Sequence, residues 1–311
     1  MDAESHPTME MLGMLYAPVG AVLDLAVDCT GFTVVSLHEG RMRREVYLMG
    51  SRDGSGFSTL PPLTAQSDSI TADTEGHIWL SQGMNVTRLT ASGASTDSRF
   101  SVHTGIPLAS TQVLAMQCVA DNRFYYITKY ECMGQTWATL DMYKVNDGSR
   151  DQLAQHVSHT HGFAVFPNVD DKGTKVLFIS KSESLCQLDL GSREVRVLVV
   201  DFTHTSARLF SGPGPLAALL VPDPSQSPPT SSLYSCSEEG ELQLLRSGLV
   251  VADNMLAVNK AGDALFFQPH QVKKELLNLV RLRSALPPRS IPASEEWKAD
   301  ISSVKHELSQ S

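Results

Sequence analysis

The sequence predicts an all-β fold: a six-bladed β-propeller of four-stranded antiparallel blades, with a short C-terminal tail that is helical or disordered. Three observations predict it. A phrase of apolar strand, turn and second apolar strand recurs along the 311 residues, its turns are evenly spaced, and tight hairpin turns separate further strands. A repeat of roughly 40 to 50 residues is typical of propeller blades. The clearest copies are 25–35, 70–80, 164–179 and 256–267.

The spacing of the turns gives the number of blades. Gly31 and Gly76 are 45 residues apart, whereas Gly173 and Gly262 are 89 apart, about twice that period. The long gap predicts a hidden unit with its turn near residue 217. Two apolar runs flank Gly and Pro residues there, at 207–210 and 216–221, as expected for strand, turn and strand. Six units are therefore expected, whereas two separate β-sandwiches would not need an even period.

Each unit has room for four short strands, and their bounds follow from apolar runs and turn residues. In the second unit we expect strands at 69–72, 77–81, 86–89 and 99–103; in the third at 113–119, 124–129 and 136–145; in the fourth at 184–190 and 194–200; and in the last at 256–258, 264–268 and 276–282. Continuous apolar runs such as 176–179 predict strands buried on both faces, as in sheets stacked between other sheets.

A propeller needs a clasp, because an open ring would leave strand edges exposed. Residues 9–16 precede the first repeat and have the pattern of a strand. We expect this segment to supply the outer strand of the last blade. The predicted organisation is thus a flexible N-terminus at 1–8, the propeller at 9–286, and a Pro-rich linker with an amphipathic tail at 287–311.

Two segments break the repeat. Residues 221–232 are rich in Pro and Ser, which predicts a mobile, exposed loop within the fifth unit. After the prolines of 287–292, Ser294 is a candidate N-cap for a helix. Spacings of 4, 3 and 4 residues place four apolar side chains on one face of that helix, so we predict that the tail binds a partner or docks on the propeller. These candidate partner-binding residues are Trp297, Ile301, Val304 and Leu308.

Composition excludes several classes of protein. The formal net charge of -9 argues against nucleic-acid binding, which normally requires a basic surface. No stretch reaches the roughly 18 to 20 apolar residues of a membrane helix, so no membrane insertion is expected. The five cysteines are scattered and odd in number. Together with the absence of a secretory signal, this favours reduced thiols and a cytoplasmic or nuclear location.

The second unit resembles an NHL-type repeat. Residues 70–81 look like that family's apolar, Asp-x-x-Gly, apolar phrase, and 84–89 look like its Asn-x-Arg-apolar continuation. The first unit matches only at 25–35, and the others match at the strand-turn-strand alone. The resemblance implies a six-bladed binding platform with partners on its loop faces or in its central channel. Sugar-lactone hydrolases share the phrase, so it specifies fold better than function.

Two groups of residues are candidates for chemistry. His156, His159 and His161 lie within six residues and could gather a metal ion, although a polar loop is the simpler interpretation. The resemblance to lactonase-like propellers implies a divalent ion held by carboxylates in the channel. Asp24 and Asp68 precede inner strands and could face it. The equivalent positions of later blades are apolar, namely Met116, Phe166 and Met255, and the Asp residues of the repeat turns are expected to bond their own backbone.

These observations predict a non-catalytic protein-interaction scaffold, a subunit or adaptor of a larger assembly. Its partners would be other proteins, bound through loop faces or the C-terminal tail, and no cofactor or metal is expected. The alternative is a metal-dependent hydrolase of the sugar-lactone type that uses the propeller channel. RNA binding by an NHL-like face is a third hypothesis, which the acidic composition disfavours.

Overall fold

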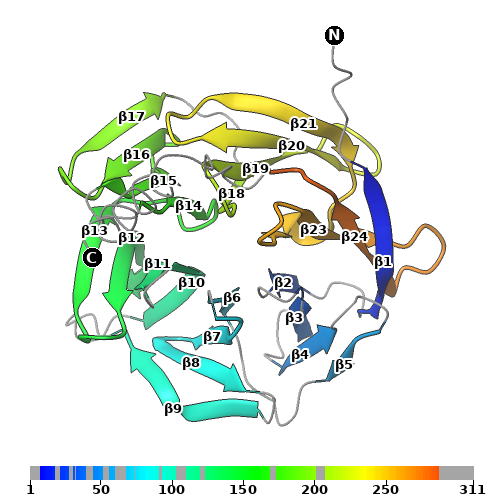
Figure 1. The fold of residues 1–311 in the computed structure, drawn as a ribbon, viewed down its shortest axis with the longest axis horizontal. Helices are drawn as coiled ribbons and strands as arrows, with labels where there is room; N and C mark the ends of the chain where they lie inside the picture. The colour runs from blue at the N-terminus through cyan, green and yellow to red at the C-terminus, as the bar shows by residue number, and fades with distance from the viewer. Residues whose placement is uncertain are drawn as a thin grey trace, which may run out of the picture.

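The computed structural model describes residues 8–17, 22–27, 31, 33–39, 45–51, 56–59, 68–73, 75–90, 93–102, 110–119, 123–168, 173–200 and 207–286. Within them, strands β1 to β24 form six four-stranded antiparallel sheets, arranged as blades around a central channel (Figure 1). The predicted six-bladed propeller is confirmed, including the hidden fifth blade.

In blades 1 to 5 the strands follow the chain from the channel outwards. Blade 1 contains β2 (Val22–Val27), β3 (Thr33–Glu39), β4 (Glu45–Ser51) and β5 (Ser58–Thr59); blade 2 contains β6 (Ser69–Ala72), β7 (Ile78–Gln82), β8 (Asn85–Thr90) and β9 (Gly93–Ser101); blade 3 contains β10 (Ser110–Val119), β11 (Arg123–Cys132), β12 (Gln135–Lys144) and β13 (Arg150–Gln155). Blade 4 contains β14 (Phe163–Phe166), β15 (Lys175–Ile179), β16 (Leu185–Asp189) and β17 (Val195–Val199); blade 5 contains β18 (Arg208–Phe210), β19 (Leu216–Asp223), β20 (Thr230–Ser237) and β21 (Leu242–Leu249).

Blade 6 is closed by both ends of the propeller. A short 3-10 turn, η2 (Ala252–Asn254), leads into β22 (Leu256–Val258), β23 (Ala264–Pro269) and β24 (Leu276–Leu282), and the fourth strand is β1 (Met9–Tyr16) from the N-terminal side. Met9 pairs with Leu282 and Tyr16 with Leu276, with a bulge between Met11 and Gly13. The predicted clasp is therefore confirmed (Figure 1).

Side-chain contacts hold the clasp strand β1 in place in addition to its backbone hydrogen bonds with β24. Glu10 Oε2 accepts hydrogen bonds from Arg281 Nη2 at 2.6 Å and from Arg283 Nε at 2.9 Å. These bonds lower the pKa of the Glu10 carboxyl. Leu15, on the other face of β1, is only 1% exposed and packs between blades 6 and 1. The strand thus fastens the ring through its backbone, one ionic cluster and one buried side chain.

The described hydrophobic core is divided into six clusters, and each lies between two neighbouring blades. Consecutive side chains of a strand point to opposite faces, so the middle strands must be apolar on both. In β11, Phe124 and Tyr126 pack toward blade 2, whereas Tyr125 and Ile127 pack toward blade 4. This explains the continuous apolar runs in the sequence.

The repeat turns are built by side chains that bond their own backbone. Asp73 Oδ1 accepts the backbone N–H groups of Glu75 and His77, at 3.0 and 2.8 Å. Asp73 Oδ2 accepts the indole N–H of Trp79 at 2.8 Å. The prediction that this residue forms a turn is confirmed, whereas its counterparts Asp28 and Asp170 lie outside the described residues.

The structure corrects two of the predicted bounds. The outer strand of blade 2 begins at Gly93 instead of residue 99. The predicted loop at 221–232 is confined to the exposed residues 224–229, because β19 continues to Asp223, β20 begins at Thr230, and these two residues pair. Both errors have one cause: Pro, Ser and Gly residues break the apolar pattern, but a hairpin edge needs only backbone pairing to continue.

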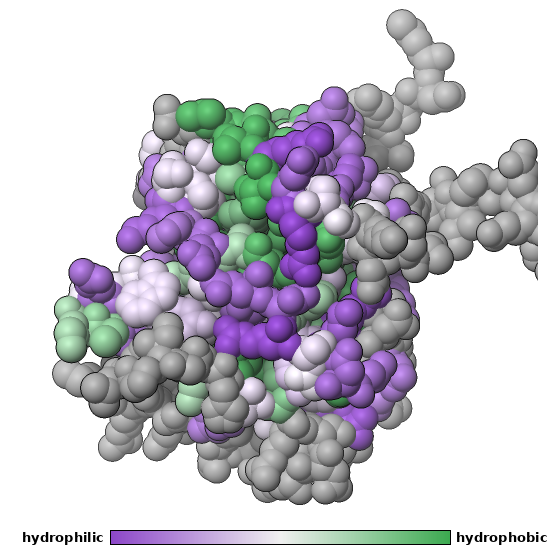
Figure 2. Space-filling model, turned by 90° about the vertical axis from the view of Figure 1, so that its left-hand side faces the viewer, coloured by the Kyte–Doolittle hydropathy of each residue, from purple (hydrophilic) through white to green (hydrophobic). Residues whose placement is uncertain are grey.

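Three outer strands carry exposed apolar side chains, which we call the rim strips. The strip on β17 is formed by Val195, Val197 and Val199, the strip on β21 by Leu242 and Leu244, and the strip on β1 by Met9, Met11, Met14 and Tyr16. Figure 2, viewed from the side of blade 4, shows a hydrophobic band in the upper half of this face, where β17 lies. The described residues include no helix with the length and apolar character needed to cross a bilayer.

The clasp predicts a matched pair of effects on stability. Replacing buried Leu15 by Ala should lower the free energy of unfolding by about 3 kcal/mol, because a cavity opens between blades 6 and 1. Met11→Ala on the same strand, at a residue 65% exposed, should change it by less than about 0.5 kcal/mol. Chemical denaturation measures both, and equal effects would show that β1 does not hold the ring closed.

Candidate functional site

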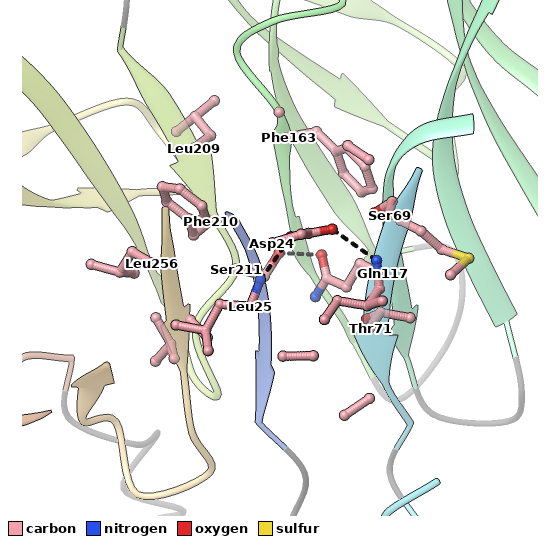
Figure 3. Close-up of a pocket in the computed structure, with 18 of the residues that line it drawn as sticks. Asp24, Leu25, Ser69, Thr71, Gln117, Phe163, Leu209, Phe210, Ser211 and Leu256 are labelled. Carbon is pink, nitrogen blue, oxygen red and sulfur yellow. Dashed lines mark hydrogen bonds between the residues drawn. The ribbon is translucent and has the colours of Figure 1, made fainter. Parts of the chain in front are cut away.

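The central channel contains a large cavity lined by described residues. The inner strands of all six blades surround it, and its volume is about 870 Å³. Figure 3 shows part of its lining, with Phe163 and Phe210 on either side of Asp24. Apolar side chains make up much of the wall, and polar groups gather where the inner strands begin.

Asp24 joins the inner strands of blades 1 and 2. Its Oδ1 accepts the backbone N–H of Leu25 at 2.9 Å, and its Oδ2 accepts that of Ile70, also at 2.9 Å (Figure 3). Burial raises the pKa of the Asp24 carboxyl to about 6, although these hydrogen bonds favour the charged form. Both oxygens are therefore engaged within the protein.

Asp68 has the same function between blades 2 and 3. One oxygen accepts the backbone N–H of Gly83 at 2.6 Å, and the other accepts the side-chain amide of Gln112, also at 2.6 Å. Asp68 precedes the inner strand β6 as predicted, whereas Asp24 lies within β2 and does not precede it. The structure adds that each carboxylate connects its own blade to the next.

Blades 4 and 5 are joined by an imidazole. His161 is buried, and its Nδ1 lies 2.6 Å from the carbonyl oxygen of Ala207, to which it must donate. Leu209 N–H returns a bond of 2.8 Å to His161 O. Gly162 permits this approach, because its φ is +66° and a Cβ there would lie 2.7 Å from Leu209 O.

A second polar bridge crosses part of the channel. Val165 N–H of blade 4 donates to Ser211 Oγ of blade 5 at 2.9 Å. That hydroxyl in turn donates to Gln117 Oε1 of blade 3 (Figure 3). The bridge connects two blades that are not neighbours, so it stiffens the inner ring.

The histidine loop does not gather its three imidazoles for a ligand. His156 and His159 are exposed, whereas His161 is buried and bonded to Ala207. Burial and the nearby charge of Lys129 lower the pKa of His159. Within the described part of the chain, no three His, Cys, Asp or Glu side chains are grouped so that they could hold a metal ion.

One predicted channel position is wrong. Met116 and Met255 do line the channel, but Phe166 is absent from its wall and packs between blades 4 and 5. Phe163, three residues earlier, lines the channel instead. The cause is a shift of register: β14 is short, and its bridge to blade 5 is made by Gly162.

Sequence reasoning missed Arg208, a channel-lining residue of β18. Its Nη1 contacts Met255 Sδ of blade 6. Burial lowers the pKa of its guanidinium, and the carboxylates of Asp24 and Asp253 partly oppose that effect. The repeat held the signal, because Arg208 lies two blade periods after Met116.

The candidate tail residues Trp297, Ile301, Val304 and Leu308 lie outside the described residues. Their role in partner binding stays a prediction.

Comparison with known proteins identifies the fold. No protein-family model matches the chain, and no curated protein matches it significantly in sequence. A gluconolactonase from Xanthomonas campestris is similar in structure, with a TM-score of 0.59, 14% identity, and coverage of 90% of this chain and 96% of that one. A putative gluconolactonase has a TM-score of 0.54 and 12% identity, with 90% of each chain covered.

An oligogalacturonate lyase in complex with manganese is also similar, with a TM-score of 0.51 and 11% identity over 85% of this chain and 80% of that one. At identities this low, the likeness shows the six-bladed propeller and not an activity. The class that fold and channel define is therefore a six-bladed propeller of the architecture found in gluconolactonases and lyases.

The raised pKa of Asp24 predicts a pH dependence with a definite sign. The folded protein holds this proton up to about pH 6, whereas the unfolded chain releases it near pH 3.8. The contribution of Asp24 to stability should thus be largest below pH 3.8 and fall by up to about 3 kcal/mol as pH rises to about 6. Denaturation of wild type and Asp24→Asn across this range measures it.

Asp24→Asn also loses one acceptor for a backbone N–H, so only the change with pH is diagnostic. The stability difference between wild type and variant should shift in favour of the variant from pH 4 to pH 6. A shift in favour of wild type would mean that the ionised carboxylate is the stabilising form.

Proposed function

We propose that the protein is a non-catalytic interaction scaffold that binds other proteins through its rim. The observation that carries this proposal is the strip of exposed valines on β17, among which Val197 is 57% exposed. Large apolar side chains placed together on a surface are characteristic of protein-binding sites. Neighbouring blades extend the pattern through the strips on β21 and β1.

The backbone of the rim supports the same function. β17 is the last strand of its sheet, so its outer edge presents backbone donors and acceptors beside the valines. An extended segment of a partner can add to such an edge, gaining ladder hydrogen bonds and pockets for alternate side chains. The polar outer strand β13 of blade 3, with the sequence RDQLAQ, offers the same edge without an apolar strip.

The carboxylates that could bind a metal ion in the channel favour a scaffold over a hydrolase. A divalent ion of the lactonase type needs free carboxylate oxygens. Asp24 and Asp68 instead spend both oxygens on hydrogen bonds between and within blades. Met116 and Met255 occupy the equivalent wall positions. The described residues do not fit such an ion.

The C-terminal tail belongs to the proposal as a second contact. Trp297, Ile301, Val304 and Leu308 would anchor it in a groove of the partner, since aromatic and aliphatic side chains supply most interface energy. The net charge of -9 keeps nucleic acid a disfavoured partner. A cytoplasmic or nuclear location fits the scattered cysteines.

The rim proposal predicts a site-dependent crosslinking pattern. A photoreactive side chain placed at Val197 should yield discrete adducts with partner proteins in native extract, because the strip would lie inside the interface. The same side chain at Gln152 on polar β13 is the matched control and should yield none. Trp297→Ala combined with Ile301→Ala should weaken the Val197 adducts by about tenfold. Identical adducts at 152 and 197 would contradict the proposal.

A sugar-lactone hydrolase is the second candidate, favoured by the shared fold and the channel cavity. We expect the scaffold instead, and therefore only substoichiometric metal after dialysis against Mn²⁺. Elemental analysis measures this, with Asp24→Asn and Asp68→Asn as paired variants. One ion per chain that both variants lose would reverse the ranking in favour of the hydrolase.

A further inference from the structure

Arg208 is a half-buried cation without an anionic partner among the described residues. Its guanidinium has five N–H donors, and its hydrogen bond within the described part of the chain goes to the thioether of Met255. No described carboxylate lies within ion-pair distance, although Asp24 and Asp253 are close enough to influence its charge. A partly desolvated guanidinium bonded to a weak acceptor gains when a further acceptor binds it.

The charged side chains that line the channel differ in how many hydrogen-bond or ion-pair partners they have. Asp24 and Asp68 accept hydrogen bonds on both oxygens, and Asp73 is fully used in its turn. Lys129, another lining residue, pairs with Glu131 at 3.7 Å. Arg208, in contrast, donates to a thioether among the described residues, and a ligand that supplies oxygen acceptors would complete its hydrogen bonding.

The wall beside Arg208 is apolar. Leu209, Phe210 and Leu256 lie on the side of blades 5 and 6, and Phe163 lies across from them in Figure 3. A cavity of about 870 Å³ falls within the range of roughly 300 to 1,000 Å³ that is typical of small-molecule sites. Such sites combine an apolar wall with a few placed polar groups.

We propose that the channel binds a small organic anion, with its carboxylate or phosphate on Arg208 and its apolar body against Phe163, Phe210 and Leu256. Planar guanidinium donors match these head groups in a bidentate manner. The site is separate from the rim, and it stands or falls independently of the scaffold function. Asp24 stays in its present role, holding blade 1 to blade 2 beside the bound ligand.

The probes are four small molecules that share a phenyl ring: 4-phenylbutyrate, phenyl phosphate, and, as matched controls, 4-phenylbutanol and 4-phenylbutylamine. Calorimetric titration of the full chain at neutral pH should show binding of at least one anion, about tenfold tighter than the alcohol. The relative affinity of the two anions identifies the preferred head group. Equal affinity for the alcohol or the amine would overturn the proposal, as would no binding of either anion.

Substitution tests the role of Arg208 directly. Arg208→Met keeps the apolar stem and should weaken anion binding by about tenfold while leaving alcohol binding unchanged. Arg196→Met on the outer strand β17 is the control and should change neither. If Arg208→Met fails to fold, Arg208→Lys keeps the charge but loses the planar fork, and it should weaken anion binding less than the methionine variant would. Full anion affinity retained in Arg208→Met, or in Arg208→Lys where the methionine variant does not fold, would refute the site.

Discussion

The whole ring depends on the packing of each sheet against the next. A single four-stranded sheet has two faces and buries neither alone, so the blades are stable only in series. The six described clusters follow this rule, with one at each junction between blades. A middle strand must therefore be apolar on both faces: in β11, Phe124 and Tyr126 belong to one cluster, and Tyr125 and Ile127 belong to another. Every inner feature, including the channel, is positioned by these junctions.

This packing explains why the fold could be predicted from one sequence. Strands that are buried on both faces appear as continuous apolar runs, and turns such as Asp73–Gly76 mark the interval between them. The hidden fifth blade and the clasp followed from the same regular spacing. Outer strands were predicted less well, because they are exposed and twisted. Gly93 begins β9 without an apolar signal, and Pro222 pairs within β19 although its composition suggested a loop.

The channel was only partly predictable, for a different reason. Sequence spacing placed Asp24 and Asp68 on inner strands, but it could not show which neighbouring N–H groups would take their oxygens. Those bonds depend on the register between blades, which is set by approaches such as that of Gly162 to Leu209. The same uncertainty displaced Phe166 from the channel wall. Arg208 lies at the channel position that the blade period predicts, but it was missed because it is a single charged residue within an apolar run.

The clasp has a consequence for the order in which the molecule is made. Glu10 and Arg281, which bond across it, are separated by 271 residues. Five blades are assembled from hairpins local in sequence, and these can pair as the chain leaves the ribosome. Of the described strands, β1 is synthesised before the others but can pair only after β24 has been made, so Leu12 and Leu15 stay uncovered in the meantime. During this interval the growing chain is open to mispairing or to capture by a chaperone.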